Sequence, residues 1–120
     1  MMHTQSGRRI NIGQFREVDV DLEDIAHALA CINRYQGHAP RPYSVAQHSV
    51  LAAQNAPGGY AMEALLHDAH EAYVGDVPRP LKDLLPDYRA LEDRVAATVR
   101  CRFGLREWLS SEVELVDLRL

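Results

Sequence analysis

The stretch Ala64–Pro80, ALLHDAHEAYVGDVPRP, decides the fold and raises the main chemical question. It continues an apolar run at helical spacing, whose expected buried stripe comprises Met62, Leu65, Leu66 and Ala69. Over residues 67–76 it also carries five titratable side chains, His67, Asp68, His70, Glu71 and Asp76. Residues three or four apart share a helix face, so Glu71 is expected beside His67 and Asp68. A helix from about Tyr60 to Gly75 therefore predicts a polar site within a packing element.

Two helices are expected before this stretch. The first starts at Asp21, a good N-cap residue, and runs to about Tyr35. Its apolar stripe comprises Leu22, Ile25, Ala26, Leu29 and Ile32. The second starts at Ser44, which forms a capping box with Gln47, and runs through Asn55. Glycine and prolines between the two helices predict a loop.

Two more helices are expected after it, with a turn over residues 78–86 that contains about one helical turn. The next helix starts near Pro86, a residue suited to the first helical turn, and stops at Gly104. Its stripe comprises Tyr88, Leu91, Val95 and Val99. The last helix starts at Ser111, which forms a capping box with Glu114, and still runs at residue 120. The sequence thus predicts an all-α fold, a bundle of about five helices.

The rest of the sequence bounds the class of protein. Its 120 residues suit one small domain, expected over 19–120, after an N-terminal extension (1–18) in which RRINI (8–12) predicts a short strand. The net charge of −4 offers no basic stripe for nucleic acid. No signal peptide or long apolar run is found, so no membrane contact is expected. Cys31 and Cys101 are expected to be reduced and buried, as in a cytoplasmic protein.

Two polar residues interrupt apolar helix faces elsewhere in the chain. His48 lies on the apolar face of the second helix, and Asp117 lies on or beside that of the last. Taken singly, His48 is more often a hydrogen-bonded core residue, and Asp117 a solvated carboxylate or a partner for Arg119. A buried carboxylate is costly unless it is paired or bound to a metal. With His67 and Asp68, the two residues supply imidazole and carboxylate donors that suit Zn, Mn, Fe, Co or Ni.

Two other histidines have weaker claims to this site. His70 lies three residues after His67 and can chelate an ion with it, but we expect His70 to support the ligands from behind or to face solvent. His38, in the loop before the second helix, is a candidate to contact phosphate or act as an acid, and the alternative is an ordinary surface histidine. The motifs of zinc proteases, P-loops, dinucleotide-binding folds and serine hydrolases are absent.

The order His48, His67-Asp68, Asp117 resembles the H…HD…D signature of HD-domain metal-dependent phosphohydrolases. The segments INRY, SVAQHS and LLHDAHEAYVGDVPRPLK resemble the bacterial 5'-deoxynucleotidase type. DIAHALACINRYQGH followed by PYSVAQHS is similar to a phage group that includes a dATP triphosphohydrolase. The resemblance covers roughly residues 20–120 and implies a helical HD domain with one divalent ion (Co, Mn, Zn, Ni, Fe or Mg). Family members continue for several helices after the last Asp, so C-terminal helices are expected to be missing here.

The resemblance also implies a role for each matching residue. The metal ligands are expected to be His48, His67, Asp68 and Asp117. The acidic residues that follow the HD pair correspond to Glu71 and Asp76. Arg34 is expected near phosphate and Tyr35, which replaces the tryptophan of the deoxynucleotidases, near the sugar or base. Lys82 is a further candidate to contact phosphate.

The resemblance therefore implies an enzyme that hydrolyses (deoxy)nucleotides to nucleoside plus phosphate or tripolyphosphate. Glu71 is expected to manage the proton of the attacking water, and Asp76 to orient that water or assist the leaving oxygen. The alternative is a non-catalytic HD module that binds metal and nucleotide as a sensor or partner domain; the intact Glu71 and Asp76 count against it. Hydrolysis of cyclic or alarmone nucleotides is less favoured, because no second signature is found. A small nucleotide is the expected partner, and assembly into a homo-oligomer stays open.

Overall fold

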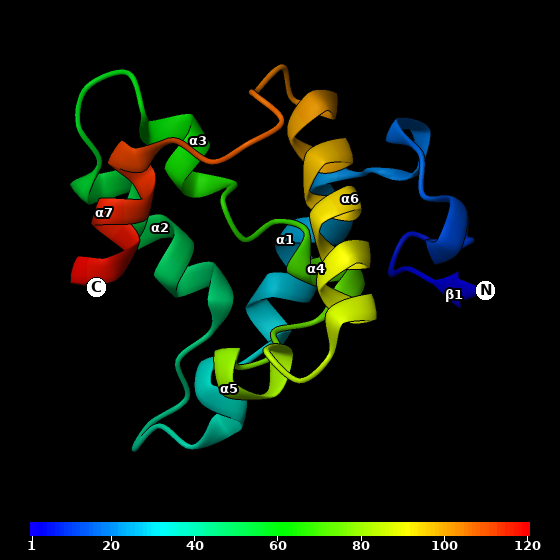
Figure 1. Ribbon diagram of the computed structural model, residues 1–120, viewed down its shortest axis with the longest axis horizontal. Coiled ribbons are helices and arrows are strands. Elements are labelled where there is room, and N and C mark those ends of the chain that lie inside the picture. Colours follow the sequence, from blue (N-terminus) through cyan, green and yellow to red (C-terminus); the bar gives the residue numbers. More distant parts are fainter.

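Seven α-helices contain half of the residues in a computed structural model that describes all 120 residues (Figure 1). They are α1 (Leu22–Cys31), α2 (Val45–Asn55), α3 (Ala61–Leu65), α4 (Glu71–Val74), α5 (Arg79–Lys82), α6 (Pro86–Arg102) and α7 (Ser111–Arg119). Three short 3-10 helices, η1 (Ile12–Gln14), η2 (Glu17–Asp19) and η3 (Arg34–Gly37), and one antiparallel strand pair, β1 (Met2–His3) with β2 (Arg9–Ile10), complete it. The expected mostly helical fold is confirmed, but five helices was too few. None of the helices combines the length and apolar character needed to cross a bilayer.

The helices form two groups around two apolar clusters. α2, α3 and α7 lie together on one side of the molecule, and α6 lies on the other with α1 and α4 (Figure 1). The larger cluster includes Ile25 and Leu29 of α1 and Val95 and Val99 of α6. The smaller one is made of Ala52, Ala64, Val113 and Val116. Because its members are short side chains, the smaller cluster alone gives α7 little hold on the rest of the protein.

The helix expected over residues 60–75 is interrupted at the HD pair. α3 ends at Leu65, α4 begins at Glu71, and the residues between them form consecutive turns. Here backbone amides bond to carbonyls three residues back: Glu71 N donates to Asp68 O at 2.9 Å, and Ala69 N to Leu66 O at 3.1 Å. A winding of three residues per turn places residues i and i+3 above one another. The continuous helix was therefore wrong, although Asp68 and Glu71 still lie together.

Two helix starts follow their capping signals closely. The Ser44 capping box is confirmed: Ser44 Oγ accepts from Gln47 N at 3.0 Å, and Gln47 Oε1 accepts from Ser44 N at 2.8 Å. In the last helix the cap is Ser110 and not Ser111, because Ser110 Oγ accepts from Val113 N at 3.2 Å. Burial of Val113 against α2 and α3 sets this register, which the adjacent serines leave ambiguous in sequence.

The first helix starts after Asp21 as expected but ends at Cys31, earlier than predicted. Its chain then becomes extended, and Asn33 pairs with Ser44 in an isolated β-bridge. The pairing aligns the segment that follows α1 with the start of α2, so Arg34 N donates to Tyr43 O at 2.8 Å. Because this segment is extended and not helical, it can pair with the start of α2, and the pairing fixes the backbone of Arg34 there.

Helical spacing found the inner residues but overestimated the width of each buried stripe. Leu22 and Met62 are 56 % and 58 % exposed, and Ala26 and Leu65 are also exposed. In a domain this small, only side chains that point straight at a cluster are covered. The thiols were misjudged as well: both cysteines are free, but Cys31 is exposed and Cys101 only half-buried.

The first residues pack against α1 and α6. Ile10, at the end of β2, is fully buried in the larger cluster, whereas Ile12 belongs to η1 and not to the strand. Ser6 donates from its amide and its hydroxyl to the two oxygens of buried Asp24, at 2.7 Å and 2.8 Å. The predicted short strand is confirmed at Arg9–Ile10, and these contacts attach its segment to α1.

One buried carboxylate anchors the last helix. Glu63 Oε2, in α3, accepts hydrogen bonds from both the amide and the hydroxyl of Ser110, the N-cap residue of α7. Both residues are buried, so neither has water as a ready alternative partner. Glu63 thereby fixes the start of the helix that carries Asp117.

We expect Glu63→Ala to lower the free energy of unfolding by about 2–4 kcal/mol, because two buried donors on Ser110 lose a charged acceptor. Glu23→Ala, which removes an exposed carboxylate from the first turn of α1, should cost no more than about 1 kcal/mol. Urea unfolding followed by circular dichroism measures both. Equal losses in the two variants would show that the Ser110 contact does not anchor α7.

Candidate metal centre and cavity

Four side chains from three segments converge between α2 and α7. His48 comes from α2, His67 and Asp68 from the turn after α3, and Asp117 from the last turn of α7. One ligand atom of each lies within 4.8 Å of the corresponding atoms of the other three, so the group can hold a metal ion. The expectation that these residues meet is confirmed. We call them the four-donor group.

The distances within the four-donor group suit one small ion. An ion with ligand bonds of about 2.1 Å in a tetrahedral arrangement holds its donors about 3.4 Å apart. His67 Nε2 lies 3.1 Å from Asp68 Oδ2 and 3.3 Å from Asp117 Oδ1. His48 Nε2 lies 2.6 Å from Asp117 Oδ1 and 3.8 Å from Asp68 Oδ2. These four separations lie within an ångström of that value, so small shifts would replace these contacts by ion coordination.

His67 is oriented by the backbone. Its Nδ1–H donates to the carbonyl of Ala64, which turns Nε2 toward Asp68 and Asp117. A hydrogen bond of this kind fixes the ring and tautomer of a metal-binding histidine. Burial alone would lower the pKa of His67, but hydrogen bonds to Asp117 and Asp68 outweigh it and raise the pKa to about 10. In the absence of an ion, His67 keeps a proton on Nε2, and this proton bonds to the carboxylates that would otherwise bind the ion.

The two carboxylates of the group are held in the ionised form. Hydrogen bonds from His48 and then His67 hold the pKa of Asp117 well below its usual range, despite its partial burial. Burial opposes ionisation of Asp68, but the hydrogen bond and charge of His67 lower its pKa. Deprotonated carboxylates and histidines turned by neighbouring groups are the form in which these residues bind ions.

Glu71 and Asp76 form a second carboxyl pair next to the four-donor group. Burial, with the nearby charges of Asp68 and Asp76, raises the pKa of Glu71 to about 10. Burial and the charge of Asp68 also raise the pKa of Asp76. Glu71 Oε1 is buried and has no hydrogen-bond partner within the protein. A buried polar atom of this kind calls for a water molecule or ligand as its partner.

A cavity of about 620 Å³ connects these groups. His67, Asp68 and Asp117 line it together with Glu71 and Asp76, and few apolar side chains take part. Its cationic side chains are Arg34, Arg79, Lys82 and Arg100. The size and polarity of the cavity suit a small charged molecule.

Lys82 lines the cavity, as expected of a phosphate contact, but it has a partner in the protein. Its ammonium lies 2.9 Å and 3.0 Å from the two oxygens of Glu92, a buried carboxylate of α6. His70 Nε2 lies 3.3 Å from the same carboxylate. His70 is therefore buried and does not face solvent, and its charge also helps to lower the pKa of Asp68 in the four-donor group. Burial opposes ionisation of Glu92, but hydrogen bonds from His70 and Lys82 lower its pKa.

Arg34 and Tyr35 lie at the edge of the cavity, in η3. The guanidinium of Arg34 lies 4.8 Å from the ring centre of Tyr35 and 5.5 Å from that of Tyr43. Such contacts are favourable for a cation over an aromatic face. Tyr35 and Gln36 adopt left-handed backbone conformations, with φ of 58° and 51°. Non-glycine residues rarely adopt this conformation, and it is found most often at functional sites.

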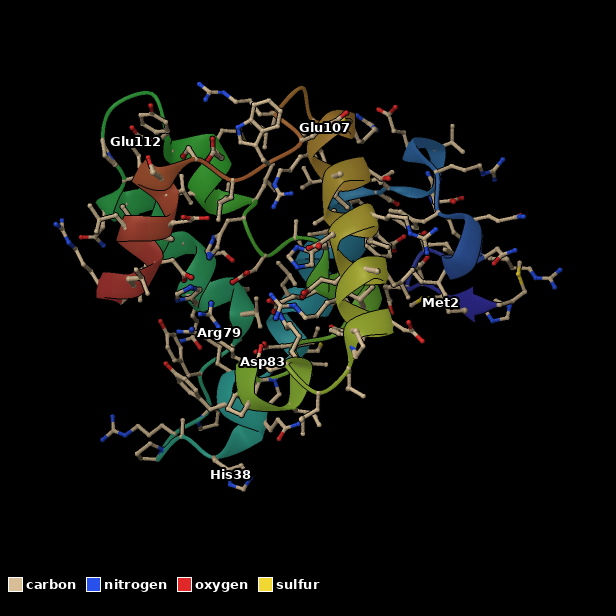
Figure 2. The ribbon with its side chains drawn as sticks, in the orientation of Figure 1. Met2, His38, Arg79, Asp83, Glu107 and Glu112 are labelled. Atoms are coloured by element: carbon tan, nitrogen blue, oxygen red, sulfur yellow. The ribbon has the colours of Figure 1, made fainter.

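His38 is not brought to the site. It is exposed in the loop after η3, does not line the cavity and points away from the lower edge of the molecule (Figure 2). The loop around it, which contains Gly37, Pro40 and Pro42, carries the chain outward before it returns to α2. The surface alternative, and not a phosphate contact, fits this position.

The sequence analysis missed several polar residues around the cavity. Glu92 and Arg100 line it from α6, and Gln36 lines it from η3. A signal for Glu92 was present, because it falls four residues after Tyr88 and three before Val95, on the apolar face of its helix. Arg100 and Gln36 carry no comparable signal, since an exposed position suits both residue types.

Comparison with known proteins identifies relatives but no activity. No protein-family model matches the chain. The uncharacterized protein YfdR of Escherichia coli strain K12 is 44 % identical over 115 residues, which cover 96 % of this chain and 65 % of YfdR. The uncharacterized protein RCAP_rcc00048 of Rhodobacter capsulatus is 39 % identical over 119 residues, with 91 % of this chain and 61 % of the relative covered. The chain thus spans less than two thirds of the length of each.

The pKa values predict a pH-dependent stability. The folded protein keeps protons on His67 and Glu71, with pKa values of about 10, that the unfolded chain loses near 6.5 and 4.5. Since the folded state binds more protons in this window, its melting temperature in EDTA should fall as pH rises from about 6.5 toward 10. A bound ion replaces the proton of His67, so the gain in melting temperature with Zn²⁺ should be larger near pH 8 than near pH 6.

Differential scanning fluorimetry over this pH range tests both expectations. His67→Asn should remove most of the gain with Zn²⁺, whereas His38→Asn, at an exposed position, should keep it. A Zn²⁺ effect that is absent, or that is the same at both pH values, would contradict the four-donor group as an ion site.

Proposed function

We propose that this protein is an HD-domain metal-dependent phosphohydrolase that acts on (deoxy)nucleotides. The observation that carries the proposal is the position of the four-donor group at one wall of a polar cavity that also holds a carboxyl pair and several cations. An ion site alone would suit a structural role. An ion site beside an unpartnered acid and cationic side chains suits the hydrolysis of a phosphate ester.

The resident cofactor is proposed to be one divalent ion held by His48, His67, Asp68 and Asp117. Two imidazoles and two carboxylates are compatible with Mn, Co, Zn, Ni or Fe, and Mg stays among the candidates. When bound, such an ion polarises a phosphoryl oxygen and lowers the pKa of a water molecule from 15.7 toward about 7.

Glu71 and Asp76 are proposed to move the protons. Water adds to phosphorus, the bond between phosphorus and the sugar oxygen breaks, and that oxygen needs a proton. Two carboxyl groups this close together repel each other when both are ionised, so the pair tends to keep one proton. The raised pKa values of Glu71 and Asp76 indicate this. The pair can therefore take the proton of the water and return one to the leaving oxygen, with no net change in its own charge.

Arg34 and Lys82 are proposed to bind the phosphoryl oxygens. Both line the cavity, and hydrogen bonds from guanidinium or ammonium to phosphate are charge-assisted. Tyr35, next to Arg34 and 54 % exposed, offers an aromatic face to the sugar or base. Phosphate would thus lie between these cations and the four-donor group, with the nucleoside toward η3.

A panel of deoxynucleoside mono- and triphosphates tests the activity, with Mn²⁺, Co²⁺ or Zn²⁺ added and phosphate and tripolyphosphate measured separately. Cleavage of the same phosphorus–oxygen bond releases phosphate from a monophosphate and tripolyphosphate from a triphosphate. We expect turnover of at least one class that stops when EDTA removes the ion. Tight nucleotide binding without turnover under every metal would instead identify the alternative, a non-catalytic sensor or partner module.

We expect Glu71→Gln to lower turnover by about 10²–10⁴, the usual contribution of a general acid or base. Metal affinity, measured by calorimetry with Zn²⁺, should change little, because Glu71 is not in the four-donor group. Glu23→Gln, an exposed glutamate of α1, serves as the matched control and should keep full activity. Near-normal turnover in Glu71→Gln would remove Glu71 from the mechanism.

A further inference from the structure

His48 uses both ring nitrogens although its side chain is fully buried. Nδ1 lies 2.9 Å from Arg34 Nη1, and Nε2 lies 2.6 Å from Asp117 Oδ1. The first contact joins His48 to a residue proposed to bind phosphate. The second joins it to a member of the four-donor group. One imidazole thus connects the two halves of the proposed active site.

The partners of His48 decide which nitrogen carries the proton. A guanidinium has only donors, so Nδ1 of His48 must accept the hydrogen bond from Arg34. The ring proton then lies on Nε2, which donates to the carboxylate of Asp117. His67 differs at the other nitrogen, because its Nδ1 carries a proton and donates to the carbonyl of Ala64. The two histidines of the same ion site are therefore held in different protonation patterns.

For His67, ion binding through Nε2 displaces only the Nε2 proton and leaves the Nδ1–H bond to the Ala64 carbonyl in place, whereas His48 has no proton on Nδ1. The Nε2 atoms are those that face Asp68 and Asp117, so an ion in the group needs a lone pair on each. A neutral His48 that binds an ion through Nε2 must therefore carry its ring proton on Nδ1. Nδ1–H and the N–H of Arg34 would then be two donors in contact, which cannot persist.

We propose that Arg34 is a latch on His48 that binding of a divalent ion releases. Release frees a guanidinium that already lines the cavity, so it can turn to a phosphoryl oxygen. The backbone can stay in place, because Arg34 N donates to Tyr43 O and the neighbouring Asn33 pairs with Ser44. The aromatic rings of Tyr35 and Tyr43 flank the guanidinium and limit its path.

The latch has two consequences that follow from linkage. The ion and Arg34 compete for His48, so Arg34 weakens ion binding in the absence of substrate. Phosphate, by holding the released guanidinium, removes that competition and strengthens ion binding in return. Since the latch requires an ion in the four-donor group, it rests on the proposed function, but its own test needs no substrate.

The test is the position of the ring protons, read by NMR of ¹⁵N-histidine-labelled protein. Metal-free protein is compared with protein saturated with Zn²⁺, which is diamagnetic. We expect His48 to carry its proton on Nε2 without metal and on Nδ1 with Zn²⁺. His67 is the internal control and should keep a proton on Nδ1 in both states. If Zn²⁺ binds the group but His48 has the same protonated nitrogen before and after, the latch is overturned while the ion site stands.

Ion affinity gives an independent measure that separates the latch from simple charge. Arg34→Met and Arg79→Met each remove one cation that lines the cavity, but only the first removes a partner of His48. We expect Arg34→Met to tighten Zn²⁺ binding about fivefold more than Arg79→Met, the effect of about 1 kcal/mol for one hydrogen bond. Equal tightening in the two variants would overturn the latch, and absence of Zn²⁺ binding to the unaltered protein would overturn the ion site as well.

Discussion

The carboxylate of Asp117 accepts hydrogen bonds from two buried imidazoles, and the arrangement of three segments depends on this contact. His48 comes from α2, His67 from the turn after α3, and Asp117 from α7, and these elements otherwise share mainly a small cluster of alanines and valines. Charge-assisted hydrogen bonds of this kind are strong, but each partner is costly to leave alone in the interior. The last helix is therefore held by the same side chains that can bind an ion, and its stability and its chemistry are not separable.

The four-donor group could be predicted from sequence because burial makes polar residues conspicuous. His48 and Asp117 fall on or beside apolar helix faces, where a polar residue needs a partner, and the HD pair supplies one. Helix starts were predicted equally well where the signal is local, as at Ser44. In both cases the signal in the sequence is local: a capping pair within one helical turn, or a polar residue within an apolar pattern. The contact between His48 and Asp117 itself is a tertiary one, which the pattern indicates only through the need of each residue for a partner.

The parts that sequence did not reveal depend on distant partners. Glu63, Glu92 and Asp24 are buried carboxylates, and each is compensated by a residue from a segment far along the chain or in another element: Ser110, Lys82 with His70, and Ser6. Glu63 and Asp24 would be expected in solvent without these tertiary contacts, and for Glu92 the apolar helix face indicates burial but not the partner that compensates its charge. The interruption of the helix at the HD pair has the same origin. Its residues have no strong breaker, and the turn is stabilised by what His67 and Asp68 reach on α2 and α7.

The charges of the cavity favour one order of events. Seven carboxyl groups and four cationic side chains line it, an excess of three negative charges when all are ionised. A phosphate dianion would deepen this excess, and Arg34 and Lys82 offset it poorly while they are engaged with His48 and Glu92. A divalent ion together with one proton kept by the Glu71–Asp76 pair would neutralise the excess. An ion that also releases Arg34 adds a mobile cation at the same moment. Under the proposed function, ion before phosphate is then the order that keeps the charge of the cavity compensated at each step, and a bound phosphate would in turn hold the ion more firmly.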